Sequence, residues 1–252
     1  MQALVQLRDI DKAYSNGTVA LRGFNLDVQA NEFISLLGPS GCGKSTVLRL
    51  VAGLGEFTRG SMRWPQQSAS SRQRDVGFVL QEPTLMPWAN VFYNVFLPFL
   101  LLDQSKSKVG QRVDEVIELV GLSGFARAYP RELSGGMKMR VSIARALVTG
   151  PRLLLMDEPF ASLDEITRTR LSNDLLSIWQ RAKCTVMFVT HSVYESVYMS
   201  QRIAVMAARP GRVIGELRID TPYPRDKEFR LTREYADHCR EVSKLLDQAI
   251  GM

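Results

Sequence analysis

Residues 38–46 read Gly-Pro-Ser-Gly-Cys-Gly-Lys-Ser-Thr and match the pattern G-x-x-x-x-G-K-[ST] without a gap. An apolar stretch, residues 33–37, precedes them, and residues 47–52 follow with apolar side chains at helical spacing. This order of strand, glycine loop and helix binds phosphate, because glycine N–H groups can curl around an anion and a helix N-terminus adds unpaired donors. The sequence therefore predicts a nucleotide phosphate site at residues 38–46.

Two side chains of this loop have specific predicted roles. Lys44 is expected to reach the β- and γ-phosphates, and the Ser45 hydroxyl is expected to hold Mg²⁺. Cys42 is interpreted as a small residue at a variable position of the loop rather than as a reactive thiol. The residues predicted to surround the phosphates are Gly38, Ser40, Gly41, Cys42, Gly43, Lys44, Ser45 and Thr46.

Polar side chains follow three further apolar runs, at the point where each run ends. Gln81 follows residues 78–80, Asp157 and Glu158 follow a run of Leu and Met, and His191 follows another apolar run. Near-continuous apolar runs are typical of parallel strands buried on both faces. Because ligands of open α/β sheets bind beyond the carboxyl ends of the strands, we expect these four side chains to converge on the nucleotide.

Each of the four has a chemical role that suits its type. Asp157 is a candidate Mg²⁺ ligand, and Glu158 is a candidate general base for the attacking water. His191 is expected to hydrogen-bond the γ-phosphate, and Gln81 to contact the metal or the water. Together with the loop at residues 38–46, they predict Mg²⁺-dependent hydrolysis of a nucleoside triphosphate.

A second glycine pair, Gly135 and Gly136, follows Ser134 at the predicted start of a helix over residues 138–148. Ser134 is a suitable N-cap, and the glycines expose backbone N–H groups. One interpretation is a plain glycine-rich helix cap. The other is a second phosphate cradle, which would serve a nucleotide held mainly by another copy of the chain.

Composition sets the broad class. The chain has 252 residues, 45% of them apolar, and a net charge of +6 from scattered Arg and Lys, which we interpret as solvated surface. The longest apolar run, residues 91–102, is too short to span a bilayer, and the N-terminus does not resemble a signal peptide. We therefore expect a soluble, cytosolic protein unless a partner holds it at a membrane. The three cysteines form neither a zinc nor a disulfide pattern.

Apolar patterning predicts an α/β fold with a helical insertion. Alternation predicts antiparallel strands over residues 3–9 and 24–29, and helical spacing dominates from 91 to 150. A turn at 15–17 and polar connections at 66–74 and 105–108 separate these segments. The remaining elements expected are strands at 59–64, 76–80, 185–190 and 202–206, helices at 109–120, 193–199 and 234–250, and a turn at 209–212.

Taken in order, these motifs resemble those of the ATP-binding cassette (ABC) ATPases. The resemblance covers most of the chain and identifies residues 38–46 as Walker A, Gln81 as the Q-loop, residues 133–137 as the signature, and Leu153 to Glu158 as Walker B. It further identifies residues 162–164 as the D-loop, His191 as the switch histidine and Tyr14 as the adenine-stacking aromatic. The signature departs from the family at Met137, where Gln is usual, and we expect activity to survive this change.

The resemblance implies a fold and a domain plan. The fold is a P-loop NTPase core with a RecA-like parallel sheet, an antiparallel β subdomain and an inserted α-helical subdomain. The expected division is one ATPase domain over residues 1–220, with the core and β part in 1–87 and 151–220 and the helical subdomain in 88–150. Residues 221–252 form a C-terminal helical tail.

Residues 81–88 and 209–212, with Pro224-Arg225-Asp226, are similar to the nitrate, sulfonate and taurine importer ATPases, a group that includes relatives for pyrimidine vitamin precursors. This resemblance implies a homodimer that closes over two ATP and Mg²⁺, using Walker A of one chain and Ser134-Gly135-Gly136 of the other. It also implies two transmembrane permease subunits, a solute-binding protein, and a place on the inner face of the cell membrane. Trp88 lies where this family meets its permease, although a core Trp of the helical subdomain is an equal alternative.

Two other functions fit part of the pattern. The ATPase of an ABC exporter fits the catalytic motifs equally well, and only residues 85–88 and the tail argue against it. A soluble ABC ATPase acting on nucleic acid fits the basic charge but usually carries two cassettes or a long coiled coil, so no nucleic-acid partner is expected. The transported solute is selected by the permease and the binding protein and has no determinant in this chain.

Overall fold

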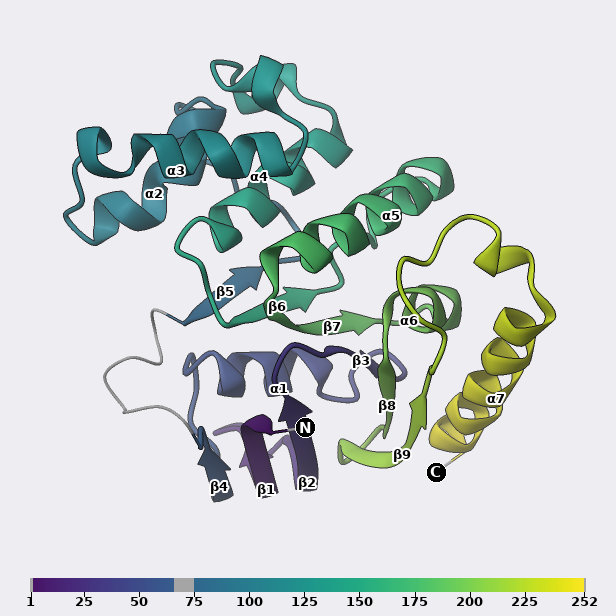
Figure 1. Cartoon of the computed structure of the whole chain (residues 1–252). Coiled ribbons are helices and arrows are strands. Elements are labelled where there is room, and N and C mark those ends of the chain that lie inside the picture. The colour runs from purple at the N-terminus through teal and green to yellow at the C-terminus, as the bar shows by residue number, and fades with distance from the viewer. Residues whose placement is uncertain (1, 66–74, 252) are drawn as a thin grey trace. The chain divides into compact units, whose positions relative to one another are not determined.

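The structure is a computed structural model that describes residues 2–65 and 75–251 (Figure 1). The predicted connection at residues 66–74 lies outside the described residues. Contacts between residues divide the chain into two units, Met1–Gln73 with Cys184–Met252, and Arg74–Lys183. The division into 1–87 with 151–220, 88–150 and 221–252 stays a prediction.

The first unit contains a three-stranded antiparallel sheet in the order β2-β1-β4. Its strands are β1 (Ala3–Ala13), β2 (Val19–Gln29) and β4 (Arg59–Arg63). The register pairs Gln6 with Asp27 and Leu7 with Leu26, so that alternate side chains of both strands enter the same apolar layer. The antiparallel strands predicted from alternation are confirmed, and both are longer than predicted.

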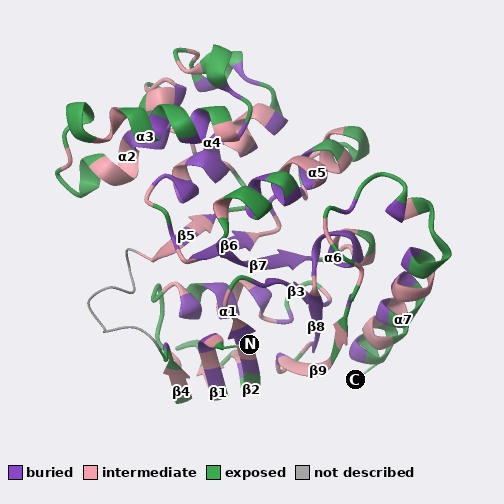
Figure 2. Cartoon of the chain, viewed as in Figure 1, coloured by how far each residue is buried: buried purple, intermediate pink, exposed green. Residues whose placement is uncertain are grey.

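A second set of strands in this unit lies in the order β7-β3-β8-β9. Strand β3 is parallel to both β7 and β8, and β9 is antiparallel to β8. Every residue of β3, β7 and β8 is buried, as the purple arrows of Figure 2 show. These strands are β3 (Phe33–Leu37), β7 (Thr185–Thr190), β8 (Arg202–Ala207) and β9 (Arg212–Arg218).

Three helices complete the first unit. They are α1 (Lys44–Val51), α6 (Val193–Met199) and α7 (Arg233–Ile250), with a short 3-10 turn, η4 (Phe229–Leu231), ahead of α7. Helix α7 lies beside β8, β9 and α6 (Figure 1). The predicted bounds of α6 are confirmed, and α7 begins one residue earlier than predicted.

The second unit pairs two parallel strands, β5 (Val76–Val79) and β6 (Leu153–Asp157), and adds four helices. The helices are α2 (Val91–Leu101), α3 (Lys106–Leu119), α4 (Gly135–Leu147) and α5 (Glu165–Ala182), with short turns η2 (Ser123–Phe125) and η3 (Pro130–Glu132). Helix α2 packs against α3 and α4, and α4 packs against α5. This confirms the helical segment expected between residues 91 and 150.

One predicted connection in this unit is wrong. The polar residues 105–108 do not link two helices, because α3 already begins at Lys106, after Ser105 in an extended N-cap conformation. Lys is a good helix former, and the buried side chains of Val113, Val116 and Ile117 pull the whole segment into one amphipathic helix. Among the described residues, no helix is both long and apolar enough to cross a membrane.

Candidate active site

The loop at residues 38–43 joins β3 to α1 in the first unit. Gly43 is the N-cap of α1 and has a left-handed backbone with φ of 96°. A Cβ there would lie 2.8 Å from the Leu21 side chain and 3.0 Å from the Ala20 carbonyl oxygen, so both the conformation and the space require glycine. The loop therefore carries bare backbone into the N-terminus of α1, where N–H groups are available to an anion.

Lys44 is held across the mouth of this loop. Its Nζ donates to the carbonyl oxygens of Gly38 at 2.8 Å and Pro39 at 3.1 Å, and the residue is only 5% exposed. Lys44 belongs to the first turn of α1, and its ammonium group contacts the first two residues of the loop. A cation in this position is suited to bind the β- and γ-phosphates of a nucleotide. Ser45 and Thr46 follow in the same helical turn.

Tyr14 lies beside the end of the loop. Its hydroxyl is 3.2 Å from the Thr46 hydroxyl, the residue is 40% exposed, and the Lys12 ammonium lies 5.1 Å from the centroid of its ring. An exposed aromatic face at this place can stack on a base whose phosphates occupy the loop. Base stacking by Tyr14 stays a prediction.

Cys42 is 1% exposed, and the space above Gly38 is filled by its sulfur, 2.8 Å from where a Cβ on Gly38 would lie. Burial argues against a reactive thiol at Cys42, because reactive thiols are accessible.

His191 follows β7 at the edge of the sheet where the phosphate loop begins. The parallel register pairs Leu37 of β3 with Thr190 of β7, so Gly38 and His191 each come next after a paired position. The residues on both sides of His191 are fixed, because the Ser192 N–H donates to the Thr190 hydroxyl at 3.0 Å. Within the first unit, Tyr14, residues 38–46 and His191 thus come from adjoining elements.

The second unit also has a pair of parallel strands, and predicted site residues follow the carboxyl ends of both. Val79 of β5 pairs with Met156 of β6, so Gln81, Asp157 and Glu158 follow paired positions at one edge. Glu158 has a left-handed backbone with φ of 46°, an unusual conformation for a residue with a long side chain. Such strain is concentrated at functional sites, where it aims a side chain that a regular strand would not.

Ser134 caps α4, and its Oγ accepts from the Met137 N–H at 3.3 Å. The helix begins at Gly135, not at Lys138, so both glycines lie in its first turn. A Cβ on Gly136 would lie 2.9 Å from the Thr167 Cγ2 and 3.5 Å from a Leu171 methyl, both on α5. Gly136 is therefore required for close packing of α4 on α5, a purpose that no local pattern in the sequence indicates.

An open cavity of about 320 Å³ lies beside this cap and is lined by Ser134, Gly136, Met137, Arg140 and Thr167, among others. The D-loop residue Asp164 is the N-cap of α5, where its Oδ1 accepts from the Thr167 N–H at 2.9 Å. Hydrogen bonds from Thr167 lower the pKa of Asp164. Ser134, Gly136 and Asp164 are thus joined through the contact of α4 with α5.

Trp88 is 77% exposed. The alternative of a core Trp is therefore wrong, while contact with a permease stays a prediction. Leu80 and Tyr93 of the same unit are also exposed.

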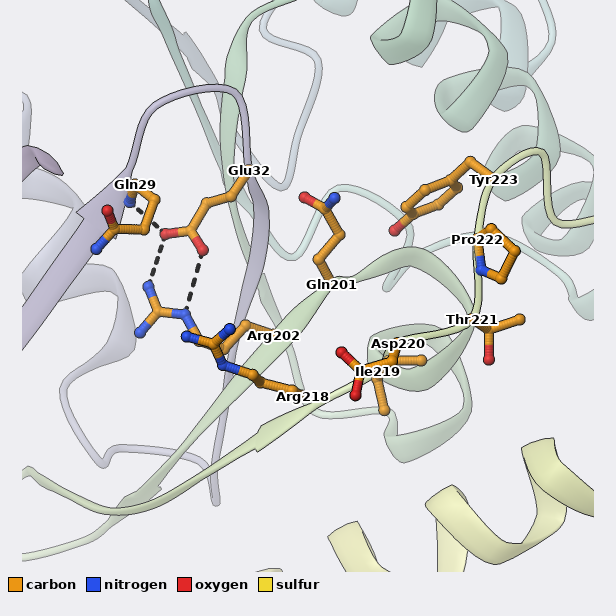
Figure 3. Close-up of a pocket in the computed structure, with 10 residues that line it drawn as sticks. All are labelled: Gln29, Glu32, Gln201, Arg202, Arg218, Ile219, Asp220, Thr221, Pro222 and Tyr223. Atoms are coloured by element: carbon orange, nitrogen blue, oxygen red, sulfur yellow. Dashed lines mark hydrogen bonds and ion pairs between the residues drawn. The ribbon is translucent and has the colours of Figure 1, made fainter. Parts of the chain in front are cut away.

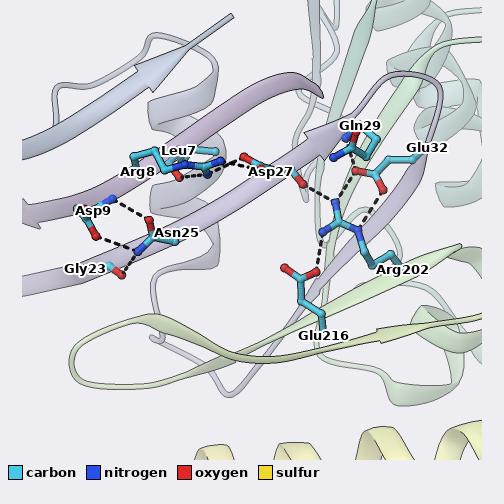
Figure 4. A network of polar contacts seen from close by, with 10 residues as sticks. All are labelled: Leu7, Arg8, Asp9, Gly23, Asn25, Asp27, Gln29, Glu32, Arg202 and Glu216. Atoms are coloured by element: carbon cyan, nitrogen blue, oxygen red, sulfur yellow. Dashed lines mark hydrogen bonds and ion pairs between the residues drawn. The ribbon is translucent and has the colours of Figure 1, made fainter. Parts of the chain in front are cut away.

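A second cavity of about 320 Å³ lies in the first unit and contains none of the predicted residues (Figure 3). Its wall includes a buried ion pair, in which Arg202 Nη2 lies 2.6 Å from Glu32 Oε1. Arg202 also bonds Glu216 at 2.7 Å and the Asp27 carbonyl oxygen, and so ties β8 to β9 and to β2 (Figure 4). No sequence pattern indicates these contacts of Arg202, because its partners are up to 175 residues away in the sequence.

The comparisons with known proteins agree with this geometry. The sequence pattern of the family described as ABC transporter matches residues 21–161, more than half of the chain. The aliphatic sulfonates import ATP-binding protein SsuB of Bacillus subtilis is 45% identical over 234 residues, which cover 92% of this chain and 91% of that protein. The nitrate import ATP-binding protein NrtD of Synechocystis is 38% identical over 251 residues, 96% of this chain and 94% of that protein.

A solved structure is also similar. The dimeric, post-hydrolysis state of the ATP-binding cassette MJ0796, bound to ADP and Pi, matches with a TM-score of 0.73 and 31% identity over 86% of this chain and 100% of that one. The chain belongs to the ABC transporter ATP-binding family. Its fold is the α/β P-loop NTPase cassette that the sequence predicts, it binds ATP, and it is an ATPase.

Proposed function

We propose that this chain is the ATP-hydrolysing subunit of an importer that takes up a small solute through separate membrane subunits. The observation that carries the proposal is the phosphate loop of the first unit, with Lys44 fixed across its mouth and His191 at the adjoining strand end. The relatives described above are named for import of aliphatic sulfonates and of nitrate. From the family resemblance, the solute class proposed is nitrate, a sulfonate or taurine, or a pyrimidine vitamin precursor.

In this proposal, the roles in ATP hydrolysis are assigned to individual residues. Residues 38–46 bind the phosphates, Tyr14 stacks on adenine, and Ser134-Gly135-Gly136 of a second copy cover the γ-phosphate. Glu158 accepts the proton of the attacking water, His191 donates to the γ-phosphate, and Gln81 orients the water. Mg²⁺, held by Ser45, Gln81 and Asp157, would neutralise phosphate charge. Hydroxyl, amide and carboxylate oxygens are the donor set that this ion prefers.

Two copies are required by this assignment. The N-terminus of α4, with Ser134 as its cap, offers a second set of backbone donors, and one phosphate loop already supplies the donors on its own side. A homodimer related by a two-fold axis gives each phosphate loop the other chain's α4. The two sites then open and close together.

The conformational change that ATP binding and hydrolysis drive is passed to the membrane subunits. Trp88, Leu80 and Tyr93 expose apolar surface close in sequence to Gln81, so a partner seated there would sense the state of the site. The partners are two permease subunits, and through them a solute-binding protein, which places the chain on the inner face of the cell membrane. No nucleic acid takes part.

Copurification tests the proposal. The tagged chain, isolated from detergent-solubilised membranes of its own host, is expected to bring two multi-span membrane proteins with it. Trp88→Ser should lose them while the purified chain still binds ATP. Leu231→Ser, an equally exposed apolar side chain in the other unit, is the matched control and should retain them.

Two results would contradict the importer assignment. One is recovery of the chain in the soluble fraction with ATPase activity that DNA or RNA stimulates. The other is a complex in which the isolated assembly never binds a solute-binding protein and, with ATP outside, accumulates solute inside inverted vesicles, as an exporter would.

A further inference from the structure

Three of the last four carbonyl groups of α6 accept hydrogen bonds from side chains of the tail. Four carbonyls at the end of any helix lack helical partners. In α6 the Ser196 carbonyl accepts from Ser200 N–H at 3.1 Å, and the Met199 carbonyl accepts from the Tyr223 hydroxyl at 2.7 Å. Burial raises the pKa of Tyr223, so its hydroxyl keeps its proton.

Arg225 supplies the donors for the remaining two carbonyl groups at this end of α6. Its Nη1 donates to the carbonyl oxygens of Val197 and Tyr198, each at 3.0 Å, and of Ser200 at 2.9 Å. The residue is 6% exposed, and all six of its hydrogen bonds to described residues end on backbone carbonyls. A buried cation at the negative end of a helix dipole is favourable, and only the guanidinium fork can reach so many acceptors at once.

Aromatic packing joins the rest of the tail to the same helix. The buried Tyr198 ring stacks on Phe229 with centroids 6.4 Å apart, and Phe229 meets Tyr235 edge-on at 5.3 Å. The Tyr198 hydroxyl donates back to the Arg225 carbonyl at 2.9 Å, and the Tyr235 hydroxyl donates to the Tyr194 carbonyl at 3.0 Å. The tail therefore contacts α6 in its first turn as well as its last.

His191 is two residues ahead of this helix. Ser192 caps α6, with its Oγ accepting from the Glu195 N–H at 3.3 Å, and Thr190 donates to the Glu195 carboxylate at 2.5 Å. These bonds tie the backbone on either side of His191 to the first turn of α6. A shift of α6 along its axis would move His191 with it.

We propose that residues 223–235, called here the tail clamp, fix α6 and thereby position His191 for ATP hydrolysis. Arg225 is the main positioning residue of the clamp. This inference rests on the proposed function of His191 and adds a role for the tail. It predicts that the clamp affects the catalytic step and leaves nucleotide binding unchanged, because the phosphate loop and Tyr14 are on other elements.

Hydrogen exchange of the full chain tests the clamp directly. Arg225→Met should speed exchange of the α6 amides at residues 196–200 by about tenfold or more, since it removes several hydrogen bonds from a charged donor. Exchange in α1, residues 44–51, should not change. The matched control is Arg240→Met, an exposed arginine of the same tail, which should leave both segments as they are. Unchanged exchange at 196–200 in Arg225→Met would overturn the inference.

Kinetics test the link to His191. Arg225→Met is expected to lower kcat on the order of tenfold and to leave KM for ATP within about twofold. The kcat of Arg225→Lys, which keeps the charge without the guanidinium fork, should lie between those of Arg225→Met and wild type. This variant replaces Arg225→Met in the test if the Met variant folds poorly. In a His191→Ala background, Arg225→Met should not lower kcat further, because the side chain that Arg225 positions is absent.

The outcomes separate this inference from the proposed function. A loss of activity in His191→Ala together with an equal further loss on adding Arg225→Met would overturn the clamp and leave the catalytic assignment standing. Wild-type activity of His191→Ala would overturn both.

Discussion

Glu158 has a left-handed backbone where β6 ends, with φ of 46°. The first four residues of β6 are buried and the strand is regular up to Asp157, so the change of conformation is confined to the edge of the sheet. The proposed function assigns this side chain to the water that attacks the γ-phosphate. The general-base role of Glu158 stays a proposal, and the unusual backbone at this residue is consistent with a functional position.

Glu158→Gln tests this assignment at a single carboxylate. The amide keeps size and shape but cannot accept a proton, so ATP hydrolysis should fall by roughly 10²- to 10⁴-fold while ATP affinity is retained. Steady-state turnover and calorimetric titration of the same preparation measure the two quantities. Glu165→Gln, on the exposed first turn of α5, is the control. Turnover at the wild-type rate in Glu158→Gln would contradict the assignment.

The site residues that can be predicted from the sequence are those whose type is chemically necessary. Gly43 and Lys44 are predictable because a left-handed N-cap and a cation at the phosphates leave few choices. Arg225 and the pair of Arg202 with Glu32 are not predictable as contacts. They unite segments far apart in the chain, and nothing local in the sequence marks an arginine that will be buried.

At the scale of elements, apolar patterning predicts the strands better than the starts of helices. Strands β3, β7 and β8 are predictable because a short, continuous apolar run between polar segments is typical of a buried parallel strand. The predicted starts of the helices that became α3 and α4 are too late, since Ser105 and Gly135 have the residue types of loops. Helix α4 begins at Gly135 because its first turn packs on α5, a tertiary contact that glycine permits.

Gly136→Ala tests that contact. Alanine favours helix by up to about 1 kcal/mol, but overpacking a tight contact typically costs about 1–3 kcal/mol, and the added methyl would lie 2.9 Å from Thr167 Cγ2. We expect a decrease of about 1 kcal/mol in the free energy of unfolding, measured by denaturant titration. Gly135→Ala, whose methyl would lie at an ordinary 3.5 Å from Leu163, should not be destabilised. Equal stability of the two variants would contradict the packing role.

At the scale of the whole molecule, the chain has two glycine-rich helix N-termini, those of α1 and α4, which the proposed function assigns to phosphate binding. Within its own unit, the loop at residues 38–46 lies beside Tyr14 and beside the strand end that carries His191. The N-terminus of α4 is a second set of donors, and the proposed function assigns it to another copy. Each ATP is then hydrolysed between two chains, and neither chain has a complete site alone.

Mixing two inactive variants tests the shared site most directly. Lys44→Ala breaks the phosphate loop, and Ser134→Arg blocks the cap of α4, so either homodimer has no intact site. Random pairing in an equal mixture makes half of the dimers mixed, each with one intact site of two, so ATP turnover should recover to about a quarter of wild type. A mixture no more active than either variant alone would contradict a site shared between two chains.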